Sequence, residues 1–259
     1  MIKEKNKKII ILQDYFLYKG GGERLVITLA KALKADIATT FIAKDTFDPR
    51  NYGLKTIKFA KEGFFSQIPG IRHIKVQLSF FLKTKFLKNY DIIIYSGDCV
   101  SSIYNAKGKL NIAYIHTPPR HLYDNYQKRL NDYRFLKQQL FKIFVKLNRW
   151  RFEHAIKKMD VLIANSKNVQ NRIKKYLGMN SIVIYPPCDT LDFKWIKQGD
   201  YYFSWARLYD VKQVDKIVKA FVKIPDKKLI VASGGPELKK IKKIAKNCNN
   251  IKILGWISD

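Results

Sequence analysis

Short apolar, β-branched runs alternate with longer amphipathic stretches along most of this chain. A run of about four to six such residues predicts a buried strand, and apolar residues spaced three and four apart predict a helix. Strands that alternate with helices form a parallel sheet covered by helices, so the pattern predicts an α/β fold. Up to residue 185 the expected strands are 9–12, 36–41, 56–59, 91–95, 111–116, 161–164 and 181–185, and the expected helices are 23–33, 72–88, 133–158 and 167–177.

A second series of the same kind begins near residue 201. Its expected strands are 201–205, 228–232 and 251–254, and its expected helices are 214–222 and 237–246. A polar stretch, 197–200, separates the two series. We therefore expect two domains, residues 1–195 and 196–259.

The charge of the chain narrows the range of partners. It has 50 Lys and Arg against 21 Asp and Glu, a net charge of +29, and an apolar content of 47% that is ample for a packed core. Such a field favours anionic partners, which are nucleic acid, an acidic membrane surface or phosphorylated substrates. Part of the net positive charge reflects a composition that is rich in Lys, Ile and Asn overall. The sequence shows no helix-turn-helix, zinc or RRM-type signature, so we expect no nucleic-acid partner.

Cysteine usage and hydropathy indicate a location inside the cell. The three cysteines, Cys99, Cys188 and Cys248, are far apart and show no metal-ligand spacing, which favours reduced thiols. No stretch approaches the roughly 18 apolar residues of a membrane-spanning helix. We expect a cytoplasmic protein that is soluble or peripheral on the inner face of the membrane.

Two candidate ligand sites lie in the first domain. Gly20, Gly21 and Gly22 stand between a strand and a helix, where glycine lets the backbone approach a ligand and the free amides at the helix start attract an anion. The spacing is not that of a Gly-x-Gly-x-x-Gly motif, which disfavours a nicotinamide cofactor. His116 and Arg120 follow another strand, at the edge where open α/β sheets bind ligands. Each signal alone is also compatible with an ordinary turn or a loop histidine.

Two more candidates lie in the second domain. Arg207 and Lys212 follow its first strand, and two cations near a strand end and a helix start suit a diphosphate. Gly235 lies in a Ser-Gly-Gly-Pro turn between a strand and a helix. Solvated surface charge and a simple tight turn are the alternatives for these two features.

The order of these motifs resembles that of glycosyltransferase family 4, a large group of retaining enzymes with the two-domain GT-B fold that includes GDP-mannose-dependent mannosyltransferases. The matching segments are Gly20–Arg24, Tyr114–Arg120 with Leu122–Asp124, Ala164–Ser166, Tyr185–Thr190, Arg207–Leu208, Lys212–Asp215, Gly235–Glu237 and Leu254–Trp256. The resemblance implies two Rossmann-like domains that face a cleft.

The resemblance also implies roles for individual residues. Gly20 and Gly21 would lie near the phosphate and sugar of the donor, and His116 beside the transferred sugar. In such retaining enzymes no protein nucleophile is needed, because the donor phosphate assists departure and accepts the acceptor proton. Arg207 and Lys212 would neutralise the leaving nucleoside diphosphate, with Gly235 also on the donor side and Arg120 on the acceptor or phosphate side. No metal or other cofactor is expected, and the donor favoured is GDP-mannose.

The resemblance implies a truncated chain. Family members continue into a Glu, seven residues, Glu motif that grips the donor sugar, and this sequence ends at Asp259 before such a motif. We expect a hexosyltransferase, in particular a mannosyltransferase, acting on a lipid-linked or polysaccharide acceptor with retention. The alternative is an inactive remnant that binds membrane or acceptor through its first domain. A GT-B epimerase of UDP-sugars is a rival that the segment around His116 disfavours.

Membrane association is expected from charge on two helices of the first domain. Lys142, Lys146 and Arg149 share one face of the long helix, and the earlier helix carries further lysines at 75, 83, 85 and 88. Basic amphipathic helices suit docking on anionic lipid. Core packing with a solvated basic face is the alternative for the same pattern.

Overall fold

The computed structural model describes residues 7–44, 46–60, 69–188, 190 and 193–257. The chain divides into two compact units, Met1–Cys188 and Asp189–Asp259, which we call the larger and the smaller unit. The domain boundary expected between residues 195 and 196 stays a prediction. Each unit has its own sheet and its own core, and each is described separately.

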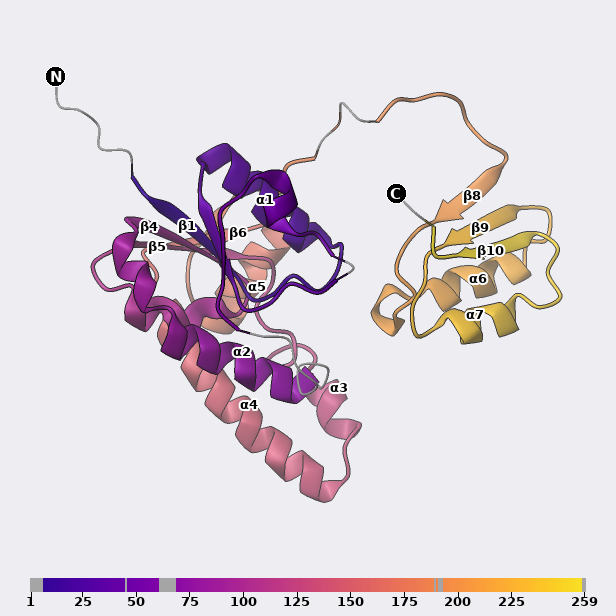
Figure 1. Cartoon of the computed structure of the whole chain (residues 1–259). Coiled ribbons are helices and arrows are strands. Elements are labelled where there is room, and N and C mark those ends of the chain that lie inside the picture. Colours follow the sequence, from indigo (N-terminus) through magenta and orange to yellow (C-terminus); the bar gives the residue numbers. More distant parts are fainter. Residues whose placement is uncertain (1–6, 45, 61–68, 189, 191–192, 258–259) are drawn as a thin grey trace. The chain divides into compact units, whose positions relative to one another are not determined.

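The larger unit is built on a seven-stranded sheet whose strand order is β3-β2-β1-β4-β5-β6-β7, and all neighbouring strands run parallel (Figure 1). The strands are β1 (Ile9–Gln13), β2 (Asp36–Thr39), β3 (Thr56–Lys58), β4 (Ile92–Ser96), β5 (Leu110–Ile115), β6 (Val161–Ala164) and β7 (Ile182–Val183). The α-helices are α1 (Gly21–Leu33), α2 (Pro69–Lys83), α3 (Tyr126–Asn131), α4 (Phe135–Ile156) and α5 (Lys167–Leu177).

Two cores form because side chains alternate across a strand. Ile10 and Leu12 of β1 face a core made with α2, α4 and α5, whereas Ile11 faces a second core made with α1. All three side chains are fully buried. A sheet covered on both faces explains why its strands appear in the sequence as nearly continuous apolar runs.

The order of the strands creates one special edge. The chain builds β1, β2 and β3 outward in one direction and then returns to place β4 on the other side of β1. Gln13 at the end of β1 thereby pairs with Ser96 at the end of β4. In open α/β sheets, ligands bind beyond the strand ends at the point where the strand order reverses. The fold therefore places its ligand edge just after these two residues.

Several elements differ from the prediction. The helix expected over 72–88 ends at Lys83, and residues Lys85–Asn89 form a separate 3₁₀ turn, so two of the lysines assigned to this helix lie outside it. Thr84 lies at the break, where its hydroxyl donates to the carbonyl of Phe80 at 2.5 Å. Short elements were also missed, namely α3 and the 3₁₀ turns Pro49–Tyr52 and Cys99–Asn105, because they are too short to show a period.

The smaller unit is a three-stranded parallel sheet with two helices. The sheet has the order β10-β9-β8, from β8 (Tyr201–Ser204), β9 (Lys228–Ala232) and β10 (Ile251–Gly255), and the helices are α6 (Val214–Val222) and α7 (Leu238–Ile244). Both helices lie on the same side of the sheet (Figure 1). Its core includes Val218, Val231 and Ile241, all of which are fully buried.

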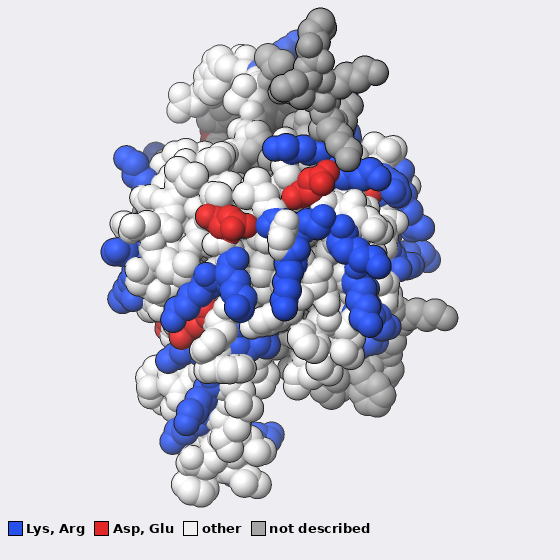
Figure 2. All heavy atoms as spheres, turned by 90° about the vertical axis from the view of Figure 1, so that its left-hand side faces the viewer, with Lys and Arg blue, Asp and Glu red and all other residues white. Residues whose placement is uncertain are grey.

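Positive charge is spread widely over the larger unit. Figure 2 shows Lys and Arg side chains gathered on the side of the molecule where the strands of the larger sheet begin. A broad shallow groove on that edge is lined by Lys7, Lys8, Lys34 and Lys55, and Lys55 pairs with Asp36 at 3.0 Å. This edge is opposite the one where ligands of α/β sheets bind. Within the described residues, no helix is long and apolar enough to cross a membrane.

Candidate functional site

The glycine-rich segment begins helix α1 at the ligand edge. Gly20 is the N-cap residue, in an extended conformation, and its carbonyl accepts the amide of Arg24 at 3.0 Å. A Cβ at Gly20 would lie 2.5 Å from a carboxylate oxygen of Glu23, and a Cβ at Gly22 would lie 3.9 Å from the ring of His116. The fold therefore brings together the first turn of α1 and His116, which are far apart in the sequence.

His116 follows β5 and is held by a hydrogen bond. Its Nε2 lies 2.9 Å from the hydroxyl of Ser96, the last residue of β4, and its ring packs edge-on against Tyr114. Burial lowers the pKa of His116 below its ordinary value, so the ring is neutral at neutral pH. A neutral imidazole can donate or accept one hydrogen bond at its remaining nitrogen. His116 is thus an oriented hydrogen-bonding group.

Arg120 is engaged by neighbouring side chains. Its Nε donates to Asp124 at 3.0 Å, and Asp124 also pairs with Arg172 at 2.9 Å. These hydrogen bonds lower the pKa of the Asp124 carboxyl despite its partial burial, so it stays ionised. Arg120 still has an exposed side chain, of which 43% is accessible to solvent. Its predicted role on the acceptor or phosphate side stays a prediction.

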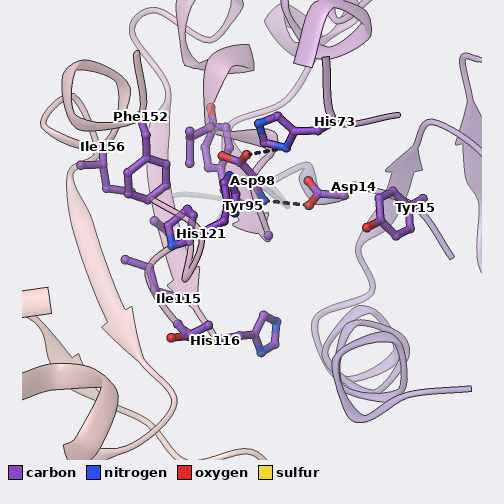
Figure 3. Close-up of a pocket in the computed structure, with 15 residues that line it drawn as sticks. Asp14, Tyr15, His73, Tyr95, Asp98, Ile115, His116, His121, Phe152 and Ile156 are labelled. Carbon is purple, nitrogen blue, oxygen red and sulfur yellow. Dashed lines mark hydrogen bonds and ion pairs between the residues drawn. The ribbon is translucent and has the colours of Figure 1, made fainter. Parts of the chain in front are cut away.

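A cavity of about 310 Å³ lies next to His116, beyond the ends of β1, β4 and β5. It is lined by Asp14, Tyr15, His73, Tyr95, Gly97, Asp98, Val100, Ala113, Ile115, His116, Thr117, Pro119, His121, Phe152 and Ile156. Figure 3 shows the labelled side chains of these residues arranged around the space. The cavity therefore occupies the point where the strand order reverses.

Two carboxyl groups lie on one wall of this cavity. Asp14 Oδ2 accepts the backbone amide of Asp98 at 2.9 Å (Figure 3). Gly97 makes this approach possible, since its φ is +111° and a Cβ there would lie 2.7 Å from the same carboxylate oxygen. Any other residue at this position would be strained and would push Asp14 away.

Asp98 is tied to the two long helices. Its carboxylate lies 3.4 Å from the guanidinium of Arg151 on α4 and 3.5 Å from Nδ1 of His73 on α2. Gln77 of α2 donates to the carbonyl of Asp98 at 2.7 Å and accepts from Arg151 at 2.6 Å. The network joins β4, α2 and α4 around one buried carboxylate.

Burial governs the ionisation of this cluster. Burial and the nearby charge of Asp98 raise the pKa of Asp14 from 3.8 to about 7. Burial also raises the pKa of Asp98, while Arg151 and His73 oppose the rise. Burial lowers the pKa of the His121 ring to about 4, and the charges of His73 and nearby arginines act in the same direction. Asp14 thus titrates near neutral pH beside a neutral histidine.

The sequence analysis did not single out Asp14, Asp98, His73 or His121. A signal for the two aspartates was present, because Asp14 lies two residues and Asp98 three residues after the end of a strand that the hydrophobic pattern predicts. In the structure Arg151 pairs with Asp98 at 3.4 Å. Among the described residues, no group of three His, Cys, Asp or Glu side chains is arranged to hold a metal ion.

In the smaller unit, the loops after β8 and β9 are joined around Leu208. The amide of Leu208 donates to Gly234 at 3.0 Å, and its carbonyl accepts from Glu237 at 3.0 Å. Gly235 has a φ of +152°, and a Cβ there would lie 2.6 Å from the Leu208 carbonyl. Arg207 is therefore held next to the glycine turn, and Lys212 lies exposed in the 3₁₀ turn Asp210–Lys212 just before α6.

Comparison with solved structures identifies the fold. Anabaena HepE, solved with UDP and glucose, matches 97% of this chain and 70% of its own with a TM-score of 0.67 and 17% identity. TarM from S. aureus, solved with UDP, gives a TM-score of 0.63 at 13% identity over 97% of this chain and 78% of its own. The lipopolysaccharide outer core galactosyltransferase WaaB gives 0.60 at 13% identity over 97% and 68%. These likenesses show an α/β fold of the GT-B type.

Sequence comparison supplies the family. A search of curated proteins found no significant match. The family model described as Glycosyltransferase Family 4 matches residues 19–191, a span that contains both the glycine start of α1 and the His116 loop. The chain belongs to Glycosyltransferase Family 4.

Proposed function

We propose that this protein transfers a hexose from a nucleoside diphosphate sugar to a hydroxyl group of an acceptor. The observation that carries the proposal is the proximity of the first turn of α1 to His116, at the point where the strand order of the larger sheet reverses. Free amides at a helix start bind anionic oxygens, and a neutral histidine beside them can bind a sugar hydroxyl. The UDP found in HepE and TarM supports a nucleotide donor.

In this proposal the larger unit binds the sugar end of the donor. Gly20 and Gly21 would lie beside the phosphate. The amide of Gly20 already donates to the carbonyl of Tyr18 at 3.0 Å, so Gly21 would offer its amide, and an added Cβ at Gly21 would meet no atom within 4 Å. His116, oriented by Ser96, would hold the transferred sugar. Arg120, already paired with Asp124, would act on the acceptor or phosphate side.

The smaller unit would bind the diphosphate. Arg207 and Lys212 would neutralise the charge that develops on the leaving group, and Gly235 lets the loop after β9 approach that of Arg207. Charged hydrogen bonds contribute about 1.5–3 kcal/mol each, so the loss of either cation would slow transfer by about ten- to a hundredfold. We favour mannose from GDP-mannose and retention of configuration, which follow from the resemblance within the family.

A thermal-shift panel of GDP- and UDP-sugars tests the donor. We expect at least one donor to raise the melting temperature, because a ligand that binds only the folded state stabilises it by mass action. Arg207→Ala and Lys212→Ala should abolish the shift, while Lys223→Ala, at the opposite end of α6 from Lys212, should keep it. The absence of a shift with every donor would remove the support for transfer and favour the alternative, a remnant that binds without catalysing.

We also propose that the protein docks on anionic membranes through α2 and α4. These helices lie side by side (Figure 1), joined by hydrogen bonds from His73 to Asn148 and from Arg151 to Gln77. Their outer faces expose large apolar side chains that are half to three-quarters accessible: Ile74, Leu78, Phe81 and Leu82 on α2, and Phe135, Leu136, Leu140, Ile143, Leu147 and Trp150 on α4. Exposure of this stripe counts against core packing, the alternative interpretation of the same pattern.

Cations flank this apolar surface. Lys142 and Lys146 lie on α4 and line a groove together with Trp150 of this surface. Arg149, also expected on this basic face, instead donates to the carbonyl of Leu122 and stacks over the ring of Tyr123. An exposed apolar stripe next to lysines suits the surface of an anionic bilayer, and an acceptor that is lipid-linked would be presented there.

Liposome flotation tests this docking. We expect the protein to float with vesicles of acidic lipid at low salt and to stay in solution with zwitterionic vesicles. Replacing Leu140 and Leu147 by serine should abolish flotation, whereas serine at Ile182, an exposed apolar residue of β7, should not. Equal flotation of both variants, or none by the unchanged protein, would contradict the proposal.

A further inference from the structure

The cavity beside His116 is unlike the rest of this basic protein. The chain has 50 Lys and Arg residues, yet none of the described residues that line the cavity is a lysine or an arginine. The ionisable groups on its wall are two carboxyls, Asp14 and Asp98, with three histidines and two tyrosines. The described lining of the cavity thus holds no lysine or arginine that would receive a phosphate or a carboxylate.

Two of the three histidines, His116 and His121, do not supply positive charge at neutral pH, and the third, His73, faces the Asp98 carboxylate at 3.5 Å. Burial lowers the pKa of His116, and it lowers that of His121 to about 4. Two arginines lie behind the lining: Arg151 is engaged by Asp98 and by Gln77, and Arg72 lies over the ring of Tyr15, 5.3 Å from its centroid. An anionic group in this cavity would lie next to Asp98 and, above neutral pH, next to a second ionised carboxylate at Asp14. Such a like-charge contact in a poorly solvated site is unfavourable.

Asp14 offers an unused hydrogen-bond acceptor. Its Oδ2 is occupied by the amide of Asp98, whereas its Oδ1 has almost no contact with solvent and no partner in the described part of the chain. A buried carboxylate oxygen of this kind is stabilised by a donor. Asp14 lines the cavity, and rotation of its carboxyl would bring this oxygen to a hydroxyl group bound there.

The remaining walls suit a sugar ring. Val100, Phe152 and Ile156 provide an apolar surface for the C–H face of a ring. Thr117 is exposed, so the cavity reaches the protein surface at the His116 loop. A volume of about 310 Å³ is at the small end for a ligand site and fits one ring.

We propose that this cavity binds a neutral, hydroxyl-bearing ring at the end of the acceptor, and that the two carboxyls of Asp14 and Asp98, with no lysine or arginine in the described lining, select it against phosphorylated or acidic rings. The assignment of the ring to the acceptor rests on the proposed transferase function. The binding of a neutral glycoside in the cavity does not rest on it, so the two can be tested separately.

The histidines provide the test. The chain has four, and three of them, His73, His116 and His121, line the cavity, while His154 on α4 is exposed and outside it. Imidazole resonances of the full chain are recorded by NMR during titration with methyl α-glucoside or methyl α-mannoside. We expect the signals of His116 and His121 to shift and that of His154 to stay. Glucose 6-phosphate and glucuronate should shift them only at about tenfold higher concentration or not at all.

A variant assigns the effect to Asp14. Asp14→Ala should weaken binding of the neutral glycoside by about tenfold, the loss of one hydrogen bond to a charged group. Asp226→Ala, which removes an exposed carboxylate of the smaller unit, should leave it unchanged. The histidine spectrum also shows whether the Asp14 variant is folded. The comparison of neutral with anionic rings uses the unchanged protein, so that test does not depend on the variant.

Each outcome has a defined meaning. Shifts with anionic rings at equal or lower concentration would overturn the proposal, as would the absence of shifts with both neutral glycosides. If nucleotide sugars stabilise the protein but no glycoside moves His116 and His121, the inference fails and the transferase function stands. If glycosides bind but no nucleotide sugar does, the cavity is established as a glycoside site and the transferase function fails.

Discussion

Replacing Gly97 by alanine tests the geometry on which the carboxyl pair depends. Gly97 has a φ of +111°, and an added Cβ would lie 2.7 Å from Oδ2 and 2.9 Å from Cγ of Asp14. The variant must therefore adopt a strained backbone, displace Asp14, or both. Displacing Asp14 also removes the acceptor of the Asp98 amide.

The expected cost follows from these two terms. A side chain in a region of backbone conformation that is nearly restricted to glycine costs about 1–3 kcal/mol. Loss of a hydrogen bond to a buried carboxylate costs about 1.5–3 kcal/mol. Relaxation prevents full addition of the terms, so we expect the larger unit to lose about 3–4 kcal/mol. For a unit of this size that loss lowers the melting temperature by about 10 °C.

Urea unfolding followed by circular dichroism measures this loss. Gly108→Ala is the matched control, because Gly108 has a φ of +71° but a Cβ there would meet no atom within 4 Å. It should cost about 1 kcal/mol. In an Asp14→Ala background, Gly97→Ala should cost at least about 1 kcal/mol less than in the unchanged chain. Equal losses for the Gly97 and Gly108 variants, or additive effects of Gly97 and Asp14, would refute the reasoning.

Three further predictions concern the same features. The folded state raises the pKa of Asp14 from 3.8 to about 7 and so holds a proton that the unfolded chain releases. Stability should therefore fall as the pH rises from about 4 to about 7, by up to about 1.4 kcal/mol per pH unit. Asp14→Asn should remove this fall. If the urea midpoints of the two proteins change with pH in parallel, the prediction is contradicted. Arg151→Met removes the arginine partner of Asp98 and should cost about 2–3 kcal/mol of stability. Adding Asp98→Asn should recover most of this loss, and no recovery would show that the Arg151–Asp98 ion pair is not the cause. Gly235→Ala should destabilise the smaller unit by about 2 kcal/mol or more, since an added Cβ would meet a backbone carbonyl at 2.6 Å. Gly234→Ala is the control, because its Cβ would make only an ordinary contact at 3.6 Å and should be nearly neutral. Thermal unfolding measures both variants.

Much of the fold could be predicted from the hydrophobic pattern. Strands such as 161–164 and helices such as 167–177 agree with β6 and α5 because both are regular and bounded by clear signals, Gly178 at one end and the N-cap Ser166 at the other. The break after Lys83 was missed, since the apolar spacing continues through Leu87, which is buried by the 3₁₀ turn rather than by the helix. The spacing of apolar residues indicates which residues are buried, and it does not reveal a change from α-helix to 3₁₀ turn.

The candidate site was predicted only in part. His116 and the glycines at the start of α1 could be found because each follows a strand, and the structure places them next to each other. The partners of Asp98 could not be found in this way. His73 and Arg151 lie inside helices, where a charged residue has the same sequence pattern whether it faces solvent or a buried carboxylate. Only the pairing of distant segments reveals the difference.

The contact between Asp14 and the Asp98 amide joins residues that are 84 positions apart in the chain. It cannot form until β1 and β4 have paired, which closes a loop containing β2, β3 and α2. Loop closure of this length carries a large entropic cost before any contact repays it. During synthesis this contact therefore cannot form until β4 has emerged, and during unfolding it is lost when the central pair of strands separates. A molecule that binds in this cavity would hold the whole larger unit together, and its effect should extend to slow amide exchange in the sheet far from the ligand.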